Sequence, residues 1–275
     1  MIQHRTMSLE ELRTVLDWAA DEGWNPGLDD AEAFHAADPE GFFIALDGGA
    51  PVAAISVVNH SDVFAFLGLY LCRPDYRGRG IGFRLWQTAI AHAGDRTIGL
   101  DGVPDQQENY ARSGFVHAGG TTRYSGRVSG QVERMMRGAK RDEIPGLVSL
   151  EAAASGHQKP AYLTPWFKGG DTRATYVLGD KNLTRGFATI RRCRAGAKIG
   201  PLISDDPDIA ERMIRHLAAE FCPDIMIDIP SSSASLDSLC QSLGLEPGFQ
   251  TARMYRGTML QPGSPVYAVA TLELG

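Results

Sequence analysis

Residues 69–82 decide the fold of this chain, and they read Leu-Tyr-Leu-Cys-Arg-Pro-Asp-Tyr-Arg-Gly-Arg-Gly-Ile-Gly. An apolar strand runs into a turn of alternating glycines, and an amphipathic helix is predicted to follow over about 80–93. Glycines leave backbone N–H groups uncovered, and the start of a helix carries the positive end of its dipole. Arg77 and Arg79 add two cations. The segment therefore predicts a cradle for a pyrophosphate.

The spacing of the glycines excludes two common phosphate-binding loops. A dinucleotide fold needs Gly-x-Gly-x-x-Gly and a P-loop ends in Gly-Lys-Ser/Thr, whereas these glycines alternate and no Lys-Ser/Thr follows. The segment instead resembles motif A of the GCN5-related N-acetyltransferases (the GNAT family), Gln/Arg-x-x-Gly-x-Gly/Ala, with Arg77, Gly80 and Gly82 at its three positions. Downstream, residues 109–115, Asn-Tyr-Ala-Arg-Ser-Gly-Phe, resemble the family's motif B, in which a tyrosine lies four residues before Gly-Phe.

This resemblance implies a cofactor and a proton donor. The cofactor is acetyl-CoA, and the hydroxyl of Tyr110 protonates the departing thiolate. A bulge in the motif A strand opens it near residues 71–73, whose N–H groups would bind the pantetheine and the thioester oxygen. The residues expected to bind the cofactor are Leu71, Cys72, Arg73, Arg77, Gly78, Arg79, Gly80, Ile81, Gly82 and Asn109.

The general base is not given by the resemblance. Histone-type members of the family carry a glutamate where this chain has Phe66. Asp101, at the end of the next predicted strand, is the best replacement, because it can accept a proton directly or through water. It fits a turn cap equally well. A small amine can also arrive neutral and need no base.

Four residues are candidates for the acceptor site. Trp24 follows the first predicted helix, where this family often lines its acceptor cleft, although it also suits a core position. Tyr70 is expected on the same face of the motif A strand as Phe66. Gln106 lies close to Tyr110, and Tyr124 ends the first half of the chain.

The second half of the chain repeats the first. The anchors are Gly68 with Gly200, Gly114 with Gly244, and Gly126 with Gly257, at separations of 132, 130 and 131 residues. A nearly constant spacing predicts a tandem repeat. We therefore predict an α/β (α+β) fold with two GNAT-like domains, each a mixed, mostly antiparallel central sheet flanked by helices. The catalytic domain covers residues 1–127, a basic linker 128–145, and a degenerate domain 146–275.

The expected elements of the first copy follow from apolar patterning and turn residues. Ser8 and Glu11 form a capping box for the first helix. Helices are expected over about 9–20, 80–93 and 106–113, and strands over 42–46, 51–58, 63–72, 97–101 and 115–124. A last strand is expected over about 267–274.

The second copy has lost the cofactor chemistry. Residues 204–208, Ser-Asp-Asp-Pro-Asp, replace the glycine loop, and Cys240 stands where the first copy has Tyr110. Asp206 and Pro207 are good helix-starting residues. The carboxylates would repel a pyrophosphate, so we expect coenzyme A to bind the first copy alone.

Composition limits the remaining possibilities. The 275 residues are 43% hydrophobic and 22% charged, with a net charge of −6, which is typical of a soluble globular protein and argues against nucleic-acid binding. The four cysteines form no Cys-x-x-Cys pair, and the histidine spacing matches no metal motif, so we expect free thiols, no metal and a cytoplasmic location. No apolar run approaches the roughly 18 residues of a membrane span.

The sequence therefore predicts an acetyl-CoA-dependent N-acetyltransferase. It would act on a small-molecule or peptide primary amine by direct transfer in a ternary complex, as a monomer or homodimer. Two alternatives stay open: a non-catalytic acyl-CoA-binding sensor or scaffold, and an enzyme that transfers a longer acyl or aminoacyl group.

Overall fold

The computed structural model describes residues 2–179, 183–261, 263 and 267–275. The first half contains β1 (Ile2–Thr6), α1 (Leu9–Asp21), α2 (Asp30–Ala37), β2 (Phe42–Asp47), β3 (Ala50–Asn59), β4 (Phe64–Cys72), the 3-10 turn η1 (Pro74–Tyr76), α3 (Ile81–His92), β5 (Thr97–Gly102), the 3-10 turn η2 (Pro104–Gln106), α4 (Gln107–Arg112) and β6 (Val116–Arg127).

The second half repeats this order of elements. It contains β7 (Met136–Gly138), α5 (Ile144–Ser155), α6 (Pro160–Lys168), β8 (Arg173–Gly179), β9 (Thr184–Arg192), β10 (Ala197–Ser204), α7 (Pro207–Glu220), β11 (Asp224–Pro230), α8 (Ala234–Ser242), β12 (Glu246–Arg256) and a short β13 (Tyr267–Ala268). If the 3-10 turns are left aside, the order of strands and helices from β1 to β6 is the same as the order from β7 to β12. The predicted tandem repeat is confirmed.

Most elements predicted for the first copy are confirmed to within a few residues, and the capping box forms. The N–H of Ser8 donates to Glu11 Oε2 at 2.9 Å, and the N–H of Glu11 donates to Ser8 Oγ at 3.3 Å. The sequence patterning missed β1 and α2. The predicted strand over 267–274 is wrong beyond Ala268, because residues 271–275 form a tight turn in which the Gly275 N–H donates to the Thr271 carbonyl.

The predicted linker over 128–145 is structured. β7 lies within it and pairs antiparallel with β8, with Met136 opposite Leu178. Met136 is buried in the apolar core of the second half, which gives the physical reason for the pairing. The basic run around it therefore includes an edge strand.

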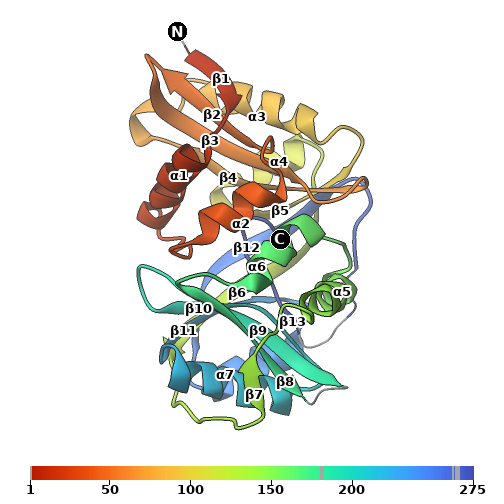
Figure 1. Cartoon of the computed structure of the whole chain (residues 1–275). Helices are drawn as coiled ribbons and strands as arrows, with labels where there is room; N and C mark the ends of the chain where they lie inside the picture. Colours follow the sequence, from red (N-terminus) through yellow and green to blue (C-terminus); the bar gives the residue numbers. More distant parts are fainter. Residues whose placement is uncertain (1, 180–182, 262, 264–266) are drawn as a thin grey trace.

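The two copies share one continuous sheet. Among the described residues its strand order is β1-β2-β3-β4-β5-β12-β6-β11-β10-β9-β8-β7. Each copy's sixth strand is thus exchanged: β12 pairs with β5 of the first copy, and β6 pairs with β11 of the second. In Figure 1, β12 and β6 cross the middle of the molecule, where the end marked C also lies.

Helices α2 and α6 join the copies on one face of the sheet. Phe34 of α2 stacks on Trp166 of α6, with ring centroids 6.1 Å apart, inside a core cluster drawn from both halves. Burial of such large aromatic side chains stabilises the contact between the halves, in addition to the pairing of the exchanged strands. No helix in the described parts of the chain combines the length and apolar character needed to cross a bilayer.

Candidate active site

A bulge in β4 shapes the centre of the site. Gly68 lies opposite Ser56 and Leu71 opposite Ala54, so that Leu69 and Tyr70 together face a single residue of β3. Leu69 adopts a φ of +48°, which a bulge imposes on the chain. The sequence predicted this opening slightly later, at residues 71–73.

The bulge also changes which side chains share a face. Phe66 packs with Phe64 and Tyr255, whereas Tyr70 contacts Trp86 on the opposite side of the sheet, with ring centroids 5.4 Å apart. The expectation that Phe66 and Tyr70 lie on one face is wrong. One extra residue in a strand reverses the alternation of every side chain beyond it.

Beyond the bulge, β4 and β5 separate. Their parallel pairing runs only from Phe64 to Leu67, opposite Thr97 to Leu100. The next residues of β4 therefore present an unpaired edge. Leu71 and Cys72 line the resulting groove on one side, and Val103 and Gln106 line it on the other.

The glycine loop closes one end of this groove. Gly78 and Gly80 have φ values of +76° and +72°, a conformation that side chains rarely adopt. Gly80 precedes the first residue of α3 and supplies no capping side chain, so the first N–H groups of this helix stay available. At Gly82 a side chain would meet the Tyr70 hydroxyl at 2.8 Å. The loop thus needs glycine for its turn, its open amides and its close packing.

The arginines of the loop have distinct positions. Arg77 lines the groove, donates from Nε to the Cys72 carbonyl at 2.9 Å and forms an ion pair with Glu22. Arg79 lies over the ring of Tyr76 at 5.0 Å and does not line the groove. Charge-assisted contacts such as the Arg77 pair hold a cation at the edge of the cradle.

Two predicted cofactor residues lie less directly in the groove. The N–H of Arg73 donates to the Val52 carbonyl at 3.0 Å, so it is already used by β3 and cannot bind the pantetheine as predicted. Asn109 is exposed on α4 and donates from Nδ2 to Gln106 Oε1 at 2.9 Å. The other predicted groove residues, Leu71, Cys72, Gly78, Gly80, Ile81 and Gly82, all line it.

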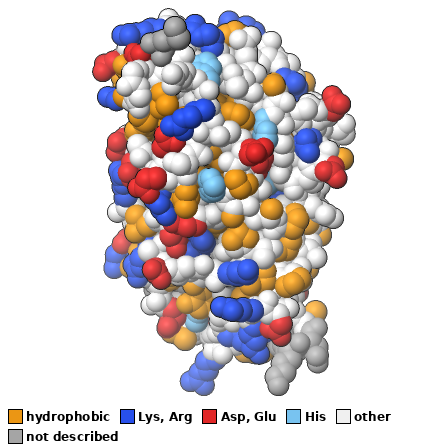
Figure 2. Space-filling model, turned by 45° about the horizontal axis from the view of Figure 1, so that its top comes forward, with side chains coloured by type: hydrophobic (Ala, Val, Ile, Leu, Met, Phe, Trp, Pro, Cys, Tyr) orange, Lys and Arg blue, Asp and Glu red, His pale blue; other side chains and the backbone are white. Residues whose placement is uncertain are grey.

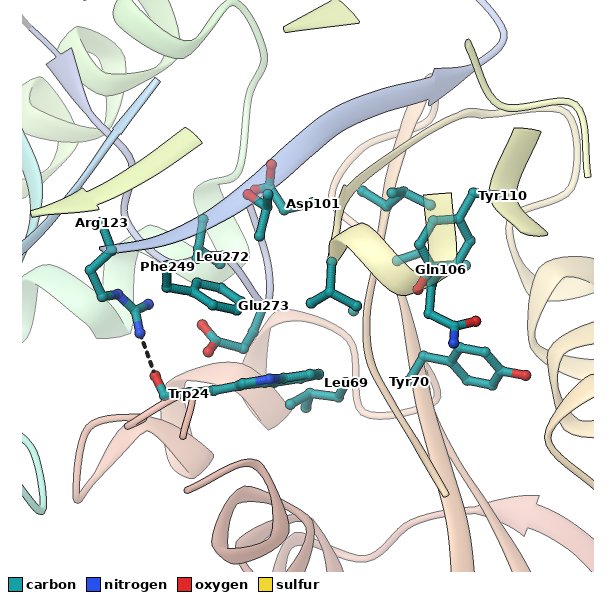
Figure 3. Close-up of a pocket in the computed structure, with 15 residues that line it drawn as sticks. Trp24, Leu69, Tyr70, Asp101, Gln106, Tyr110, Arg123, Phe249, Leu272 and Glu273 are labelled. Atoms are coloured by element: carbon teal, nitrogen blue, oxygen red, sulfur yellow. Dashed lines mark hydrogen bonds between the residues drawn. The ribbon is translucent and has the colours of Figure 1, made fainter. Parts of the chain in front are cut away.

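The groove leads into an inner cavity of about 50 Å³. The two spaces share Trp24, Tyr70, Val103 and Gln106 as lining residues, so they adjoin. The inner cavity has walls from both copies. Those of the first copy include β4, β5 and α4, and those of the second include Phe249 and Thr251 of β12 and residues 272–273. Figure 3 shows Trp24, Phe249, Leu272 and Glu273 around one space, with Tyr70 and Tyr110 to one side of it.

Tyr110 lies in the wall of this cavity. It is buried and stacks on Trp86, with ring centroids 5.5 Å apart and planes 17° from parallel. Burial raises the pKa of Tyr110, and the neighbouring Tyr70 raises it further. Its hydroxyl therefore stays protonated at neutral pH and can donate a proton.

Asp101 also reaches the cavity, but its carboxylate is engaged. Both oxygens accept from Arg253 of β12, at 2.9 and 2.7 Å, and its side chain is fully buried. The opposite charge of Asp101 outweighs the cost of burying Arg253 and raises the pKa of that arginine. Asp101 thus belongs to a bidentate ion pair across the exchanged strand, an arrangement that disfavours the base role predicted for it.

Trp24 forms one wall of the cavity and is held by the second half of the sheet. Its carbonyl accepts from Arg123 Nη1 at 2.8 Å and from Lys198 Nζ at 3.1 Å. Arg123 also forms a buried two-pronged pair with Asp228 at 2.7 and 2.9 Å. Burial opposes the charge of Arg123, but the Asp228 carboxylate outweighs it and raises the pKa of Arg123.

Of the four predicted acceptor residues, Trp24, Tyr70 and Gln106 line the cavity. Tyr124 does not: it packs in the core of the second half, where its hydroxyl donates to Asp237 Oδ1 at 2.6 Å. The reason is strand exchange, because β6 leaves the first copy and pairs with β11. The sequence missed Arg123, Phe249, Thr251 and Glu273, which only the exchange and the return of residues 271–275 bring to this cavity.

The equivalent place in the second copy is filled. β10 pairs with β11 only as far as Ile199 opposite Ile227, and β13 then pairs with β10, with Leu202 opposite Ala268. The next residue, Val269, donates its N–H to the Asp228 carbonyl of β11 at 3.1 Å. The chain itself occupies the gap that stays open between β4 and β5.

The start of α7 is also closed to an anion. Asp206 accepts from the N–H of Ile209 at 2.8 Å and so caps the helix, as predicted. Cys240, the counterpart of Tyr110, is buried in apolar surroundings, and burial raises its pKa to about 12. These features leave the second copy without the cradle or the proton donor of the first.

Comparisons with known proteins cover both halves of the chain. A model described as acetyltransferase (GNAT) family matches residues 9–115, and one described as acetyltransferase (GNAT) domain matches residues 147–268. The chain is 35% identical over 285 residues to the holothin acyltransferase of Pseudoalteromonas sp. (strain SANK 73390), and the match covers 100% of this chain and 97% of that protein.

Two solved structures share the fold. A putative acetyltransferase from Pyrococcus horikoshii superposes with a TM-score of 0.84 at 19% identity, covering 100% of this chain and 96% of the other. A tandem GNAT protein from the clavulanic acid biosynthesis pathway gives a TM-score of 0.60 at 15% identity, covering 94% of this chain and 100% of the other.

Proposed function

The chain belongs to the GNAT family of acyltransferases, and we propose that it transfers an acetyl group from acetyl-CoA to a primary amine of a small molecule. One observation carries this proposal. The groove beside the glycine loop adjoins a partly apolar inner cavity that is lined by a buried, protonated tyrosine, Tyr110.

The cofactor would occupy the groove from end to end. Its pyrophosphate would bind the amides at Gly78, Gly80 and the start of α3, with the positive helix end and Arg77 complementing its charge. The pantetheine would lie along the free edge of β4, in the gap beyond Leu67. The thioester would then face the inner cavity, where Tyr110 protonates the departing thiolate.

Transfer is proposed to be direct. Cys72 is the cysteine that lines the groove, and burial raises its pKa, so its thiol stays protonated and is a poor acyl carrier. The amine would therefore attack the thioester while both substrates are bound.

The cavity favours a small acceptor over a peptide. Its volume of about 50 Å³ leaves room for a small group only, and its predominantly apolar and aromatic walls have the character of sites for small molecules. Holothin is a specific acceptor to test, because a relative that matches the full length of this chain is named a holothin acyltransferase. The structure does not select the acyl length, so a longer acyl donor is the second candidate.

Only the first copy is proposed to bind coenzyme A. In the second copy, residues 267–269 fill the gap between the strands, and the Asp206 side chain caps the helix start.

The four free cysteines support the proposal of a cytoplasmic enzyme. On the face seen in Figure 2, acidic and basic side chains are interspersed, which fits the expected absence of nucleic-acid binding. The oligomeric state, monomer or homodimer, stays a prediction.

The first experiment is a calorimetric titration with acetyl-CoA. The wild type should bind one equivalent, and Gly80→Asp should lose binding because it adds a carboxylate at the cradle. Gly94→Asp is the matched control, since Gly94 also has a positive φ, +57°, but lies beyond the far end of α3. Two equivalents in the wild type would contradict the closed second copy.

The second experiment measures thiol release with holothin and a panel of small primary amines. Acetyl-CoA and longer acyl-CoA donors are compared at equal concentration. Turnover with at least one amine supports the enzyme. Binding of acetyl-CoA without turnover on the whole panel would favour the sensor alternative.

A further inference from the structure

We propose that Glu273 is the catalytic base that accepts the proton of the acceptor amine. The proposal rests on the function proposed above and adds a residue to the same site. Glu273 lies within a few residues of the last one in the sequence, more than 160 positions from Tyr110, and reaches the cavity through the tertiary fold.

The position of Glu273 is defined by close backbone packing against the cofactor strand. A side chain at Gly68 would lie 2.9 Å from the carbonyl carbon of Glu273 and 3.2 Å from its Cα. Gly68 immediately precedes the bulge of β4, where the groove meets the inner cavity. Glu273 is thus held beside the strand along which the thioester is expected to lie.

The carboxylate of Glu273 is buried yet free to act. The residue is 4% exposed, and within the described ranges no cation lies within 4.0 Å of it and no side-chain hydrogen bond is made to it. In Figure 3 it lies between Trp24 and Phe249, on the Arg123 side of the cavity. A carboxylate in this position has both oxygens available to a bound amine.

The two other charged residues that line the cavity are already in ion pairs. Asp101 is paired with Arg253, and Arg123 is paired with Asp228. Buried Lys198 donates to the Trp24 carbonyl, and the charge of Glu273 acts on Lys198, Arg123 and Arg191 from beyond ion-pair distance. Of the carboxylates that line the cavity in the described part of the chain, Glu273 is the one without an ion pair, so it is available to an amine bound between Trp24 and Phe249.

The turn that carries Glu273 is rigidly anchored. Its next residue, Leu274, has its carbonyl bonded to His60 Nε2 at 2.8 Å, and the backbone oxygen of Gly275 accepts from Lys159 Nζ at 2.5 Å. Thr271 Oγ1 accepts from the Leu274 N–H at 3.1 Å. Lys159 is itself paired with buried Glu151 at 2.8 Å. A group held this firmly is suited to positioning a proton acceptor.

The reaction step then balances as follows. The nitrogen lone pair attacks the thioester carbonyl carbon and forms the C–N bond, and the extra proton on nitrogen passes to Glu273, directly or through one water. The C–S bond breaks, and the thiolate takes the proton of Tyr110. Solvent exchange returns a proton to Tyr110 and removes one from Glu273.

The test compares Glu273→Gln with the wild type and with Glu40→Gln, an exposed glutamate in the turn before β2. With an amine that the wild type acetylates, we expect kcat at pH 7 to fall about 10²–10⁴-fold in Glu273→Gln. The acetyl-CoA dissociation constant should stay within about twofold, because the glycine loop is unchanged. In the pH profile of kcat, the part that depends on the Glu273 carboxylate should disappear, and only the part that depends on protonation of the amine should remain. Glu40→Gln should match the wild type.

Chemical rescue separates catalysis from structure. Glu273→Ala should regain activity when formate is added, because formate can occupy the vacated space and accept the proton. Glu273→Gln should not respond to formate, because the glutamine side chain fills that space. Wild-type kcat and pH profile in Glu273→Gln would overturn the inference while leaving the proposed function intact. Lost activity without formate rescue would also overturn it and assign Glu273 a structural role. A wild type that binds acetyl-CoA but turns over no amine would overturn both proposals.

Discussion

Gly68→Ala is the most direct probe of how the two copies build one site. The new Cβ would overlap the backbone oxygen of Glu273 and lie 2.9 Å from its carbonyl carbon. Carbon atoms in good contact are about 3.5–4.0 Å apart, so residues 271–275 must move by about 1 Å. Such a displacement of a catalytic group costs about 10²-fold in rate.

The expected result combines a kinetic and a stability effect. kcat/KM for the amine should fall about 10²-fold, and urea unfolding should show a loss of about 1–3 kcal/mol from overpacking. Acetyl-CoA affinity should change little, because the glycine loop does not contact the displaced turn. Gly138→Ala is the control, since a Cβ there meets no atom within 4 Å.

The outcome that would refute the reasoning is specific. If Gly68→Ala loses stability but keeps wild-type kcat/KM, then the turn has moved without affecting the reaction, and its position is irrelevant to catalysis. If neither quantity changes, the packing of residue 273 against β4 is not as the structure describes.

Three further predictions concern the proton donor, a buried histidine and the ion pair behind Trp24. Tyr110→Phe should lower kcat about 10²-fold or more at unchanged acetyl-CoA affinity. If single-turnover kinetics give the wild-type rate for this variant, another group protonates the thiolate. Burial and Lys159 lower the pKa of His60 to about 3, whereas an unfolded histidine titrates near 6.5. Between these values the unfolded state binds the additional proton, so the free energy of unfolding should fall on acidification by up to about 1.4 kcal/mol per pH unit. Urea unfolding at pH 7 and pH 5 should show a smaller fall for His60→Asn than for the wild type. An equal fall in both proteins would contradict the lowered pKa of His60. Arg123→Met should lower the free energy of unfolding by about 3–5 kcal/mol, because it leaves the Asp228 carboxylate buried and unpaired. The double variant that also carries Asp228→Leu should recover much of this loss. Equal stability of the single and double variants would show that the pair is not buried as described.

Local chemistry made much of the fold and the cofactor groove predictable from sequence. The alternating glycines of residues 78–82, the Ser8 capping box and the apolar patterning each depend on neighbours a few positions apart. The constant separation of the two halves, anchored for example at Gly68 and Gly200, predicted the tandem repeat. Most of the predicted cofactor residues do line the groove for the same reason: one short stretch of chain, from the end of β4 to the start of α3, supplies them.

The errors share a different cause, which is pairing between distant strands. The bulge at Leu69 and Tyr70 depends on how β4 registers with β3, and it reversed the expected face of Phe66. Asp101 was expected to be available, but it meets Arg253 across the strand that the second copy inserts. Tyr124 was expected at the acceptor site, but its strand crosses into the other half.

The sequence by itself therefore determined the family, the duplicated order of elements and the pyrophosphate cradle, because glycine conformation, helix capping and apolar periodicity act over short stretches of chain. Tertiary structure alone decided the inner cavity, where Phe249 of β12 and Glu273 meet Trp24 and Tyr110 of the first half of the chain. The physical reason is that strand exchange and the return of residues 267–275 are selected by burial of apolar surface and by hydrogen bonding across the whole sheet, and neither depends on a local pattern.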